Sequence, residues 1–242
     1  MSEKLLTLFD LDGTLLVDDA YVHGRAMVRA MREVFGVSPP DDIVELIDPW
    51  GKTDPRIARE ALHTAGLSGD AIDQYLGHWM AVAGDLFLEE APSHADAWIT
   101  RPDLAAGLRK LTESGMRLGL LTGNLREIAK AKLDLMGVAS HFDLSVSAYG
   151  SDAEERNELV PIARERAGAA GRPWARERTV VVGDTPEDIA AARADSVACV
   201  VFASERFPDD RLIGAHGVVS DMDDLVRVLQ SWQQAGGTPA PT

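Results

Sequence analysis

Short apolar runs alternate with helical patterns from residue 102 onward, and this alternation limits the fold more than any other feature of the sequence. With one run near the N-terminus, the apolar runs cover residues 5–11, 116–122, 144–148, 179–184, 198–203 and 217–220. Each helical stretch ends near a glycine or a polar turn, as helices commonly do. Strands that alternate strictly with helices form a parallel sheet that is covered on both faces. We therefore predict an α/β fold.

Residues 17–98 interrupt this alternation. They carry helical patterns, such as RAMVRAMREVFG (25–36) and PRIAREALHTAG (55–66), without a convincing strand. An all-helical insert between the first strand and the rest of the sheet is the simplest explanation, with chain crossings near Leu16–Asp19 and Ala95–Pro102. We predict a Rossmann-like core domain made of residues 1–16 and 99–242, and a helical domain made of residues 17–98.

The net charge of −15 argues against nonspecific binding to nucleic acids, because such binding needs clustered Lys and Arg side chains. No apolar run approaches the roughly 20 residues that a membrane-spanning helix requires, so we expect no membrane partner. An anionic small-molecule substrate remains compatible with this charge where cations gather locally. Binding of such a substrate therefore requires Lys or Arg side chains near the predicted site.

The N-terminal sequence MSEKLLTLFDLD has no basic region followed by a long hydrophobic stretch, so we expect no signal peptide. The single cysteine, Cys199, excludes an intramolecular disulfide and fits a reducing compartment. We expect a cytoplasmic protein. The sequence does not determine the oligomeric state; a monomer is the default expectation, and an exposed face of the helical insert is where a dimer would form.

Acidic side chains follow two of the predicted strands. Asp10 and Asp12 come after the apolar residues 5–9, and Asp184 is the last residue of the run at 179–184. Alternate residues of an extended segment point to the same side, and two carboxylates about 4 Å apart repel by roughly 4 kcal/mol at an effective dielectric of about 20. Ligands bind at the carboxyl ends of the strands in such sheets. Converging oxygen ligands predict a Mg²⁺ ion that relieves this repulsion.

A phosphate held beside this ion would place phosphorus in line with a carboxylate, which is the arrangement for nucleophilic catalysis by aspartate. The neighbouring Asp12 is then placed to act as general acid for the leaving oxygen and as general base for water. Thr122 ends the strand at 116–122, and Gly123 and Asn124 follow it. Its hydroxyl and the backbone N–H groups of this loop are candidate ligands of the phosphoryl oxygens.

Three segments carry a resemblance to a known family. DLDGT (10–14), LTGN (121–124) and GDTPED (183–188) resemble motifs one, two and four of the haloacid dehalogenase-like superfamily, in this order and spacing. The resemblance covers the whole chain, because the helical insert stands where the C1-type cap of phosphoglycolate phosphatases and β-phosphoglucomutases stands. It implies a Mg²⁺-dependent phosphatase of small phosphorylated metabolites. It also implies that Asp10 is the nucleophile, Asp12 the acid/base, and the Asp10 side chain, the Asp12 carbonyl and Asp184 the metal ligands.

Asp188 has two interpretations. By the resemblance it belongs to the metal site. The sequence Thr185-Pro186-Glu187-Asp188 is also typical of a helix start, with Thr185 as the N-cap, Pro186 at the first helical position and an acid that answers the cap. Both roles are compatible with each other.

The chain departs from the family at motif three, where a lysine is expected between motifs two and four. No lysine follows Lys132, and Lys132 itself lies in the helix directly after LTGN, too early for this motif. We predict that Arg156 takes the role of this lysine, so that a planar guanidinium with paired N–H donors replaces a compact ammonium. The alternatives are that Arg156 is a solvated side chain, or that Arg164 or Arg166 replaces it.

The helical insert contains DPWGKTDPRI (48–57), in which Lys52 and Thr53 stand at a probable helix start. Similar loops of this superfamily face the active site, so we predict that Lys52 and Thr53 help to bind substrate. The alternative is that Thr53 or Asp54 only caps the helix, with Pro55 at its first position.

Other functions stay open. A phosphomutase of the β-phosphoglucomutase type shares the same motifs, and the sequence does not tell whether water or a sugar accepts the phosphoryl group. A hydrolytic dehalogenase fits less well, because those enzymes lack the second aspartate and the metal. A regulatory or binding protein that retains the fold would be favoured by loss of Asp10 or Asp12, and both are present.

Overall fold

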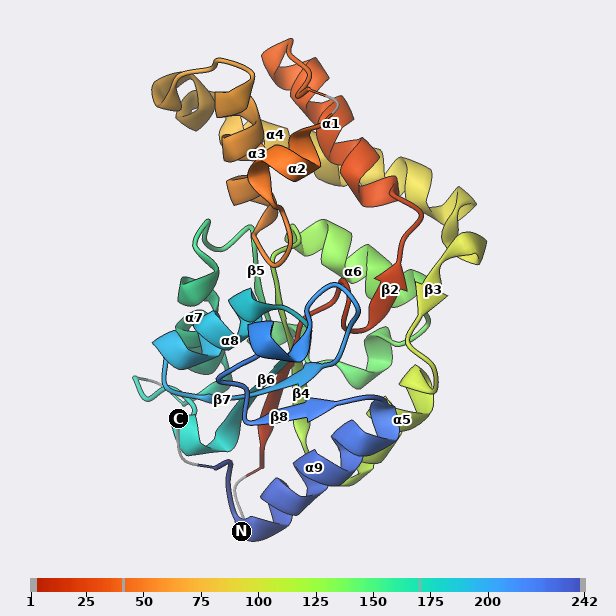
Figure 1. Cartoon of the computed structure of the whole chain (residues 1–242), viewed down its shortest axis with the longest axis vertical. Helices are drawn as coiled ribbons and strands as arrows, with labels where there is room; N and C mark the ends of the chain where they lie inside the picture. The colour runs from red at the N-terminus through yellow and green to blue at the C-terminus, as the bar shows by residue number, and fades with distance from the viewer. Residues whose placement is uncertain (1–3, 41, 170, 240–242) are drawn as a thin grey trace.

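The computed structural model describes residues 4–40, 42–169 and 171–239. A six-stranded parallel sheet with helices on its two faces forms the larger part of the molecule, and a group of helices stands at one end of it (Figure 1). This arrangement confirms the predicted α/β fold with a Rossmann-like parallel sheet. The strands, in the order β5-β4-β1-β6-β7-β8, are Ala148–Tyr149, Arg117–Thr122, Leu6–Phe9, Thr179–Gly183, Ala198–Phe202 and Gly217–Val219.

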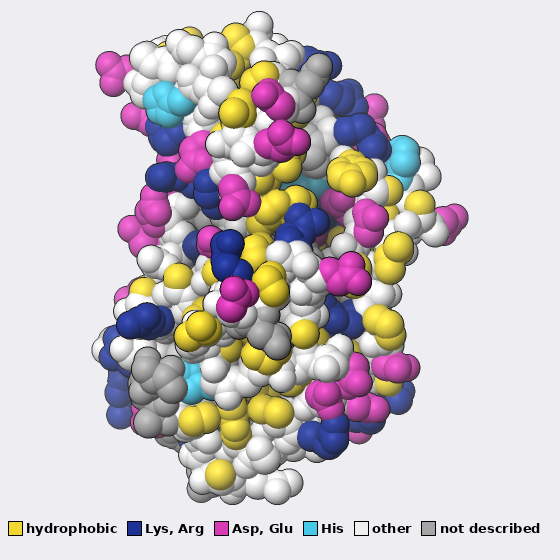
Figure 2. All heavy atoms as spheres, viewed as in Figure 1, with side chains coloured by type: hydrophobic (Ala, Val, Ile, Leu, Met, Phe, Trp, Pro, Cys, Tyr) yellow, Lys and Arg dark blue, Asp and Glu magenta, His cyan; other side chains and the backbone are white. Residues whose placement is uncertain are grey.

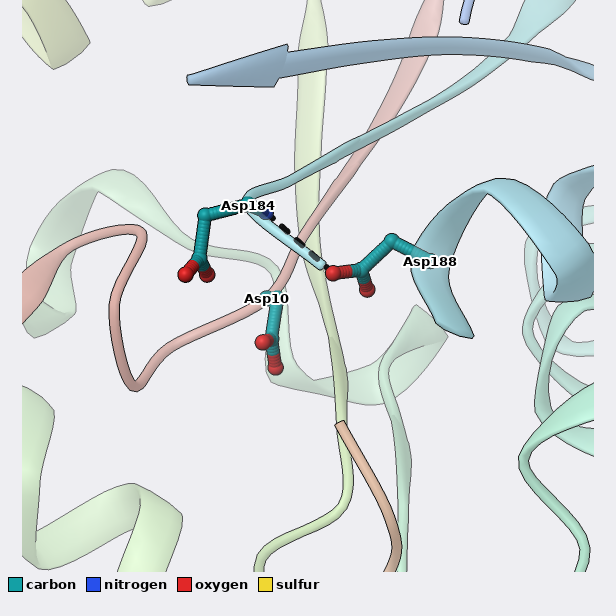
Figure 3. Close-up of side chains that lie close together, drawn as sticks. All are labelled: Asp10, Asp184 and Asp188. Carbon is teal, nitrogen blue, oxygen red and sulfur yellow. Dashed lines mark hydrogen bonds between the residues drawn. The ribbon is translucent and has the colours of Figure 1, made fainter. Parts of the chain in front are cut away.

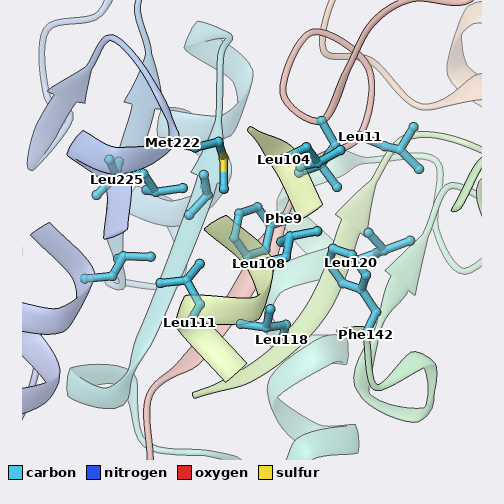
Figure 4. Close-up of a cluster of buried hydrophobic side chains, with 14 of the residues drawn as sticks. Phe9, Leu11, Leu104, Leu108, Leu111, Leu118, Leu120, Phe142, Met222 and Leu225 are labelled. Carbon is cyan, nitrogen blue, oxygen red and sulfur yellow. The ribbon is translucent and has the colours of Figure 1, made fainter. Parts of the chain in front are cut away.

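Five helices of the described part of the chain cover the sheet. They are α5 (Leu104–Glu113), α6 (Arg126–Leu135), α7 (Leu159–Ala167), α8 (Pro186–Ala194) and α9 (Met222–Ala235). Apolar residues of α5 and α9 pack on the same side as Phe9 of β1 (Figure 4), and apolar residues of α6 belong to the same cluster. Apolar residues of α7 and α8 pack with Leu6 and Leu8 on the other side. The alternation of Leu8 and Phe9 between the two clusters follows from the two-residue period of a strand.

Helices α1 (Val22–Phe35), α2 (Ile43–Ile47), α3 (Asp54–Thr64) and α4 (Gly69–Glu90) form a group that we call the helical unit. The unit has its own apolar cluster, which includes the fully buried Trp79, and Leu125 and Ile128 next to the sheet belong to the same cluster. The helical unit therefore packs onto the N-terminal end of α6. The division at residues 17 and 98 stays a prediction.

Two short strands that the sequence did not predict join the helical unit to the sheet. β2 (Leu16–Asp18) and β3 (Ile99–Thr100) pair antiparallel at the two predicted chain crossings. Helix α2 was also missed. Segments of two to five residues are too short to show a hydrophobic period, so sequence patterns do not reveal them.

The predicted strand at 144–148 is largely wrong. Leu144–Val146 forms a 3₁₀ turn, and only Ala148 of this run enters β5. The Asp143 carboxylate accepts hydrogen bonds from the backbone N–H and the hydroxyl of Ser145, and such a local turn replaces strand pairing. Other 3₁₀ turns cover Ala91–Ser93, Ala95–Ala97, Ala139–His141, Arg156–Glu158, Arg176–Arg178 and Asp209–Arg211.

No helix among the described residues is both long enough and apolar enough to cross a membrane. Lys and Arg side chains lie at the waist between the helical unit and the rest of the chain (Figure 2). Two cations lie beside acids that follow β1, because Arg156 contacts Asp10 and Lys132 contacts Asp12.

Candidate active site

The central strands β4, β1 and β6 are neighbours, and their carboxyl ends carry the predicted site. Asp10 directly follows β1, Thr122 is the last residue of β4, and Asp184 directly follows β6. The parallel register pairs Phe9 with Leu120 on one side and with Val182 on the other, so the three chain ends lie at one edge of the sheet. The structure therefore brings together the segments that the three motifs mark.

Asp10, Asp184 and Asp188 form a buried acidic cluster, in which one carboxylate oxygen of each lies within 4.8 Å of the others (Figure 3). Burial raises the pKa of Asp10 to about 7, although Arg156 lowers it, and repulsion from Asp188 and Asp12 adds to the rise. Burial also raises the pKa of Asp184 to about 8, together with repulsion from Asp188 and Asp10. Burial and mutual repulsion thus make Asp10 and Asp184 harder to ionise than free aspartates.

These residues fit a divalent cation. The donors are carboxylate oxygens, which hard ions such as Mg²⁺ prefer, and the repulsion among them is what a cation at this point would remove. Asp10 and Asp184 would hold the ion by their side chains. The Asp12 side chain is not part of the cluster, as expected for a residue that is predicted to contribute its backbone carbonyl.

Gly13 and Thr14 shape the position of Asp184. Gly13 has φ +81°, and a Cβ atom there would lie 2.2 Å from an oxygen of Asp184, so only glycine fits. The Thr14 hydroxyl donates a hydrogen bond of 2.9 Å to Asp184 Oδ1. Thr14 belongs to the DLDGT motif, but the sequence pattern by itself indicated no role for it.

Asp188 caps helix α8, as one of its two interpretations required. Its Oδ2 accepts hydrogen bonds from the backbone N–H groups of Asp184 and Thr185 and from the Thr185 hydroxyl. The Thr185 hydroxyl in turn accepts from the backbone N–H of Asp188, which completes a capping box. Asp188 also lies in the acidic cluster, which is compatible with its second interpretation. Its direct contact with a metal stays a prediction.

Arg156 reaches the nucleophile candidate. A terminal guanidinium nitrogen lies 3.0 Å from Asp10 Oδ1 and 2.5 Å from Asp188 Oδ1, and the other donates to the Gly51 carbonyl oxygen. Burial lowers the pKa of Arg156, but the Asp10 and Asp188 carboxylates outweigh it and raise the pKa overall. The side chain is buried, so the solvated alternative does not describe it. Its Nε is also buried and has no hydrogen-bond partner among the described residues.

The two substitutes for Arg156 pair elsewhere. Arg164 forms an ion pair with Asp195, and Arg166 forms one with Asp152. Neither pair includes a residue of the acidic cluster. The structure therefore brings Arg156, and neither alternative, onto Asp10.

Lys132 contacts Asp12, a pair that was not predicted from the sequence. Its ammonium lies 2.6 Å and 2.8 Å from the two carboxylate oxygens of Asp12, across 120 residues of sequence. Burial raises the pKa of Asp12, but Lys132 and His23 lower it, and the net direction is downward. A signal was present in the sequence: Lys132 falls on the apolar stripe of α6 formed by Ile128, Ala129 and Leu133, where a charge must find a partner.

The loop after β4 packs tightly against the helical unit. A Cβ atom on Gly123 would lie 2.2 Å from the Lys52 carbonyl oxygen, and the Gly123 carbonyl accepts a hydrogen bond from the backbone N–H of Asp54. Asn124 donates from Nδ2 to Asp12, while its Oδ1 is buried and has no partner among the described residues. Thr122 is fully buried at the strand end.

Lys52 and Thr53 use their polar groups within the protein. The Lys52 ammonium contacts the Ile47 carbonyl and lies 2.7 Å from Glu60, both in the helical unit. The Thr53 hydroxyl donates to the Glu154 carbonyl and accepts from the backbone N–H of Arg56, so Thr53 caps α3 as its alternative interpretation stated. Substrate contacts by these two residues stay predictions.

Comparisons with known proteins agree with this geometry. A model of the haloacid dehalogenase-like hydrolases matches residues 7–193. A phosphoglycolate phosphatase of Cereibacter sphaeroides is 27% identical over 224 residues, which cover 92% of this chain and 96% of the relative. A phosphoglycolate phosphatase of Aquifex aeolicus is 26% identical over 190 residues, which cover 77% of this chain and 78% of the relative.

Solved structures share the fold. CbbY from Rhodobacter sphaeroides, in complex with xylulose-1,5-bisphosphate, matches with a TM-score of 0.70 at 18% identity, over 92% of this chain and 96% of that chain. A putative β-phosphoglucomutase from Bacteroides vulgatus matches with a TM-score of 0.66 at 16% identity, over 98% and 92%. The family match spans more than half of the chain and shows that this protein belongs to the haloacid dehalogenase-like hydrolases, as an enzyme of the phosphatase type.

Proposed function

We propose that this protein is a Mg²⁺-dependent phosphatase that hydrolyses small phosphomonoesters through a phosphoryl group carried on Asp10. One observation carries the proposal: a buried Asp10 carboxylate lies between the acid Asp184 and the cation Arg156 at the end of β1. An aspartate held in this way is oriented, shielded from bulk water and poised to attack phosphorus. A Mg²⁺ ion at the acidic cluster would neutralise charge on the phosphate when bound.

The reaction needs two displacements. In the first, an Asp10 oxygen forms a bond to phosphorus while the bond from phosphorus to the ester oxygen breaks, and Asp12 gives its proton to the leaving oxygen. In the second, Asp12 takes a proton from water, whose oxygen attacks phosphorus and releases the Asp10 carboxylate and inorganic phosphate. Asp12 ends each turnover protonated again, so the proton balance closes.

The phosphoryl oxygens need donors that do not depend on the metal. The Thr122 hydroxyl and the backbone N–H groups of the 122–124 loop stand at the same edge of the sheet as Asp10. Arg156 adds a fixed positive charge beside Asp10. These groups would hold a phosphate with its phosphorus toward the nucleophile.

The substrate class follows from the relatives and from the helical unit. The curated relatives include phosphoglycolate phosphatases, so phosphoglycolate is the first small phosphomonoester to test. We propose that the helical unit acts as a cap domain of residues 17–98, since its 51–54 loop packs on the loop after β4. A cap in this place excludes water during the first displacement. The buried single cysteine, Cys199, agrees with the cytoplasmic location that we propose.

A phosphatase screen tests this function. The purified protein is incubated with phosphoglycolate, sugar phosphates and nucleotides, with Mg²⁺ or with a chelator, and released inorganic phosphate is measured. We expect release that depends on Mg²⁺ and disappears in the matched Asp10→Asn variant. Transfer of the phosphoryl group between positions of a sugar, without phosphate release, would instead indicate a phosphomutase. No reaction with any member of the panel would contradict the proposal.

A further inference from the structure

Lys132 is a buried cation that the proposed reaction does not yet use. Its side chain is fully buried on α6. Burial of an ammonium costs several kcal/mol unless it is paired and hydrogen bonded, and packing alone is served better by an apolar residue of similar length. Packing alone therefore does not explain a lysine at position 132, and the explanation lies in the groups that its ammonium contacts.

The ammonium of Lys132 has no donor left for a phosphate. Its neighbours are the two Asp12 oxygens at 2.6 and 2.8 Å, the His23 Nδ1 at 3.2 Å and an Asp19 oxygen at 3.5 Å. An ammonium has three N–H groups, and the first three contacts take all of them. Lys132 therefore has no free N–H group for a phosphate, and it contacts the proposed reaction machinery at Asp12.

The helical unit holds Lys132 from the other side. Lys132 only donates, so His23 Nδ1 accepts and the ring proton lies on Nε2, which donates to Asp54 Oδ2 at 3.0 Å. The same Asp54 oxygen accepts from the backbone N–H of Leu125 at 2.8 Å, beside the loop after β4. The ammonium is thus fixed between Asp12 next to the sheet and His23 of the helical unit.

Asp12 needs such a partner. Its side chain is 42% exposed, so packing does not hold the carboxylate in one orientation. Lys132 contacts both of its oxygens, and Asn124 contacts only Oδ2. A group that transfers protons to and from a substrate must keep its orientation to within a fraction of an ångström.

We propose that Lys132 is the positioning residue of the acid/base, holding the Asp12 carboxylate toward the ester oxygen and the attacking water. The inference rests on the proposed role of Asp12. The decisive measurement is therefore how strongly the loss of kcat/KM in a Lys132 variant depends on the leaving group. If Lys132 were merely structural, its replacement would lower kcat/KM for all substrates alike. If its replacement leaves the acid Asp12 wrongly oriented, kcat/KM falls only for substrates whose leaving oxygen needs a proton.

The test compares phenyl phosphate with p-nitrophenyl phosphate, which have nearly the same shape. Phenolate is strongly basic and leaves faster with a proton, whereas p-nitrophenolate leaves readily without one. For Lys132→Met we expect kcat/KM for phenyl phosphate to fall at least about 10-fold more than kcat/KM for p-nitrophenyl phosphate. This loss is part of the rate enhancement of about 10²–10⁴ that acid/base catalysis usually contributes. Lys130→Met, on the same helix but at an exposed position, is the matched control and should change neither value.

A second readout follows from the role of Asp12 as the base for water. In Lys132→Met the second displacement should become slow, so p-nitrophenolate should appear in a burst of about one equivalent of enzyme before the steady state. Rapid-mixing absorbance records this burst. Equal losses on both phosphates, or unchanged kinetics, would overturn the inference.

Folding of the variant is checked by circular dichroism and thermal unfolding. If Lys132→Met does not fold, Lys132→Gln keeps an N–H donor and is measured in the same way with the same expected discrimination. If neither folds, the lysine serves the fold and the inference is wrong. If the wild type hydrolyses neither aryl phosphate nor any member of the metabolite panel, the proposed function fails, which is distinct from failure of the role of Lys132.

Discussion

The guanidinium of Arg156 lies 3.0 Å from Asp10 Oδ1 and also contacts Asp188, so one cation serves two of the three acids in the cluster. It reaches them from a 3₁₀ turn, Arg156–Glu158, in the segment where the family has its motif-three lysine. The planar fork holds several oxygens at once, which a single ammonium does less well. This geometry supports the predicted replacement of the lysine by Arg156.

We expect Arg156→Ala to reduce kcat/KM by an amount equivalent to about 2–5 kcal/mol of transition-state stabilisation, because Asp10 loses its cation and the phosphate loses a donor. Arg156→Lys should restore only part of the rate. Steady-state kinetics on the best substrate of the screen measures both. Arg166→Ala, which removes a cation paired with Asp152, is the control and should retain wild-type values. Wild-type kinetics for Arg156→Ala would show that another residue has the motif-three role.

The two aspartates of the first motif should differ in effect. Asp10→Asn should abolish turnover while the protein stays folded, because the amide keeps the volume of the side chain and loses nucleophilicity. Asp12→Asn should slow turnover by about 10²–10⁴, the usual share of acid/base catalysis. Phosphate release and thermal unfolding are measured for both. Substantial activity of Asp10→Asn, beyond what deamidation supplies, would exclude Asp10 as the nucleophile.

Metal removal should stop the reaction. The acidic cluster holds two carboxyls whose pKa values rise through burial and mutual repulsion, and a bound cation would relieve that repulsion. We expect exhaustive chelation to abolish phosphate release, Mg²⁺ to restore it and Ca²⁺ to inhibit it. Ca²⁺ is larger and accepts more oxygens, so it would hold Asp10 away from phosphorus. Activity that survives chelation would contradict the metal site.

Stability without metal should depend on pH through Asp184, whose pKa burial raises from 3.8 to about 8. A carboxyl with a higher pKa in the folded chain binds its proton more tightly when folded. Its contribution to stability is complete below the unfolded pKa and is lost as the pH rises to about 8. In chelator, the free energy of unfolding of the wild type should therefore fall relative to that of Asp184→Asn between about pH 4 and pH 8.

Urea unfolding at several pH values measures this difference. Added Mg²⁺ should stabilise the wild type more at about pH 8 than at about pH 6, because the ion competes with protons for the same oxygens. Asp184→Asn is expected to gain less from the ion at either pH. If the free energies of unfolding of the two proteins change with pH in parallel, the pKa of Asp184 is not raised in the folded protein.

Gly123 should tolerate no side chain. A Cβ atom there would lie 2.2 Å from the Lys52 carbonyl oxygen, which is backbone and cannot rotate away. We expect Gly123→Ala to push the 51–54 loop off the loop after β4 and to reduce kcat/KM at least about 10-fold, since displacements near 1 Å cost about 10² in rate. Gly77→Ala is the control, because a Cβ at Gly77 in α4 meets nothing within 4 Å. It should stabilise the helix by about 0.5–1 kcal/mol.

Local sequence patterns determined the elements that carry the site. The apolar run before Asp10 predicted β1, and the runs at 116–122 and 179–184 predicted β4 and β6. The capping box of Thr185 and Asp188 was also predictable, because its partners are three residues apart. Where a side chain forms a turn with its own neighbours, as Asp143 does with Ser145, the apolar pattern alone was misleading.

The tertiary structure decided which charges meet. Lys132 pairs with Asp12 across 120 residues, and Arg156 meets Asp10 across the sheet edge. The apolar period of a helix indicates which of its faces is buried, and Lys132 lies on such a face of α6. This period does not say which distant carboxylate will face Lys132 there. A buried charge selects its partner only when the strands and helices have packed, because only then is water removed and the desolvation cost imposed. The sequence by itself thus determined where the acids stand, and the folded chain determined which cation each of them receives.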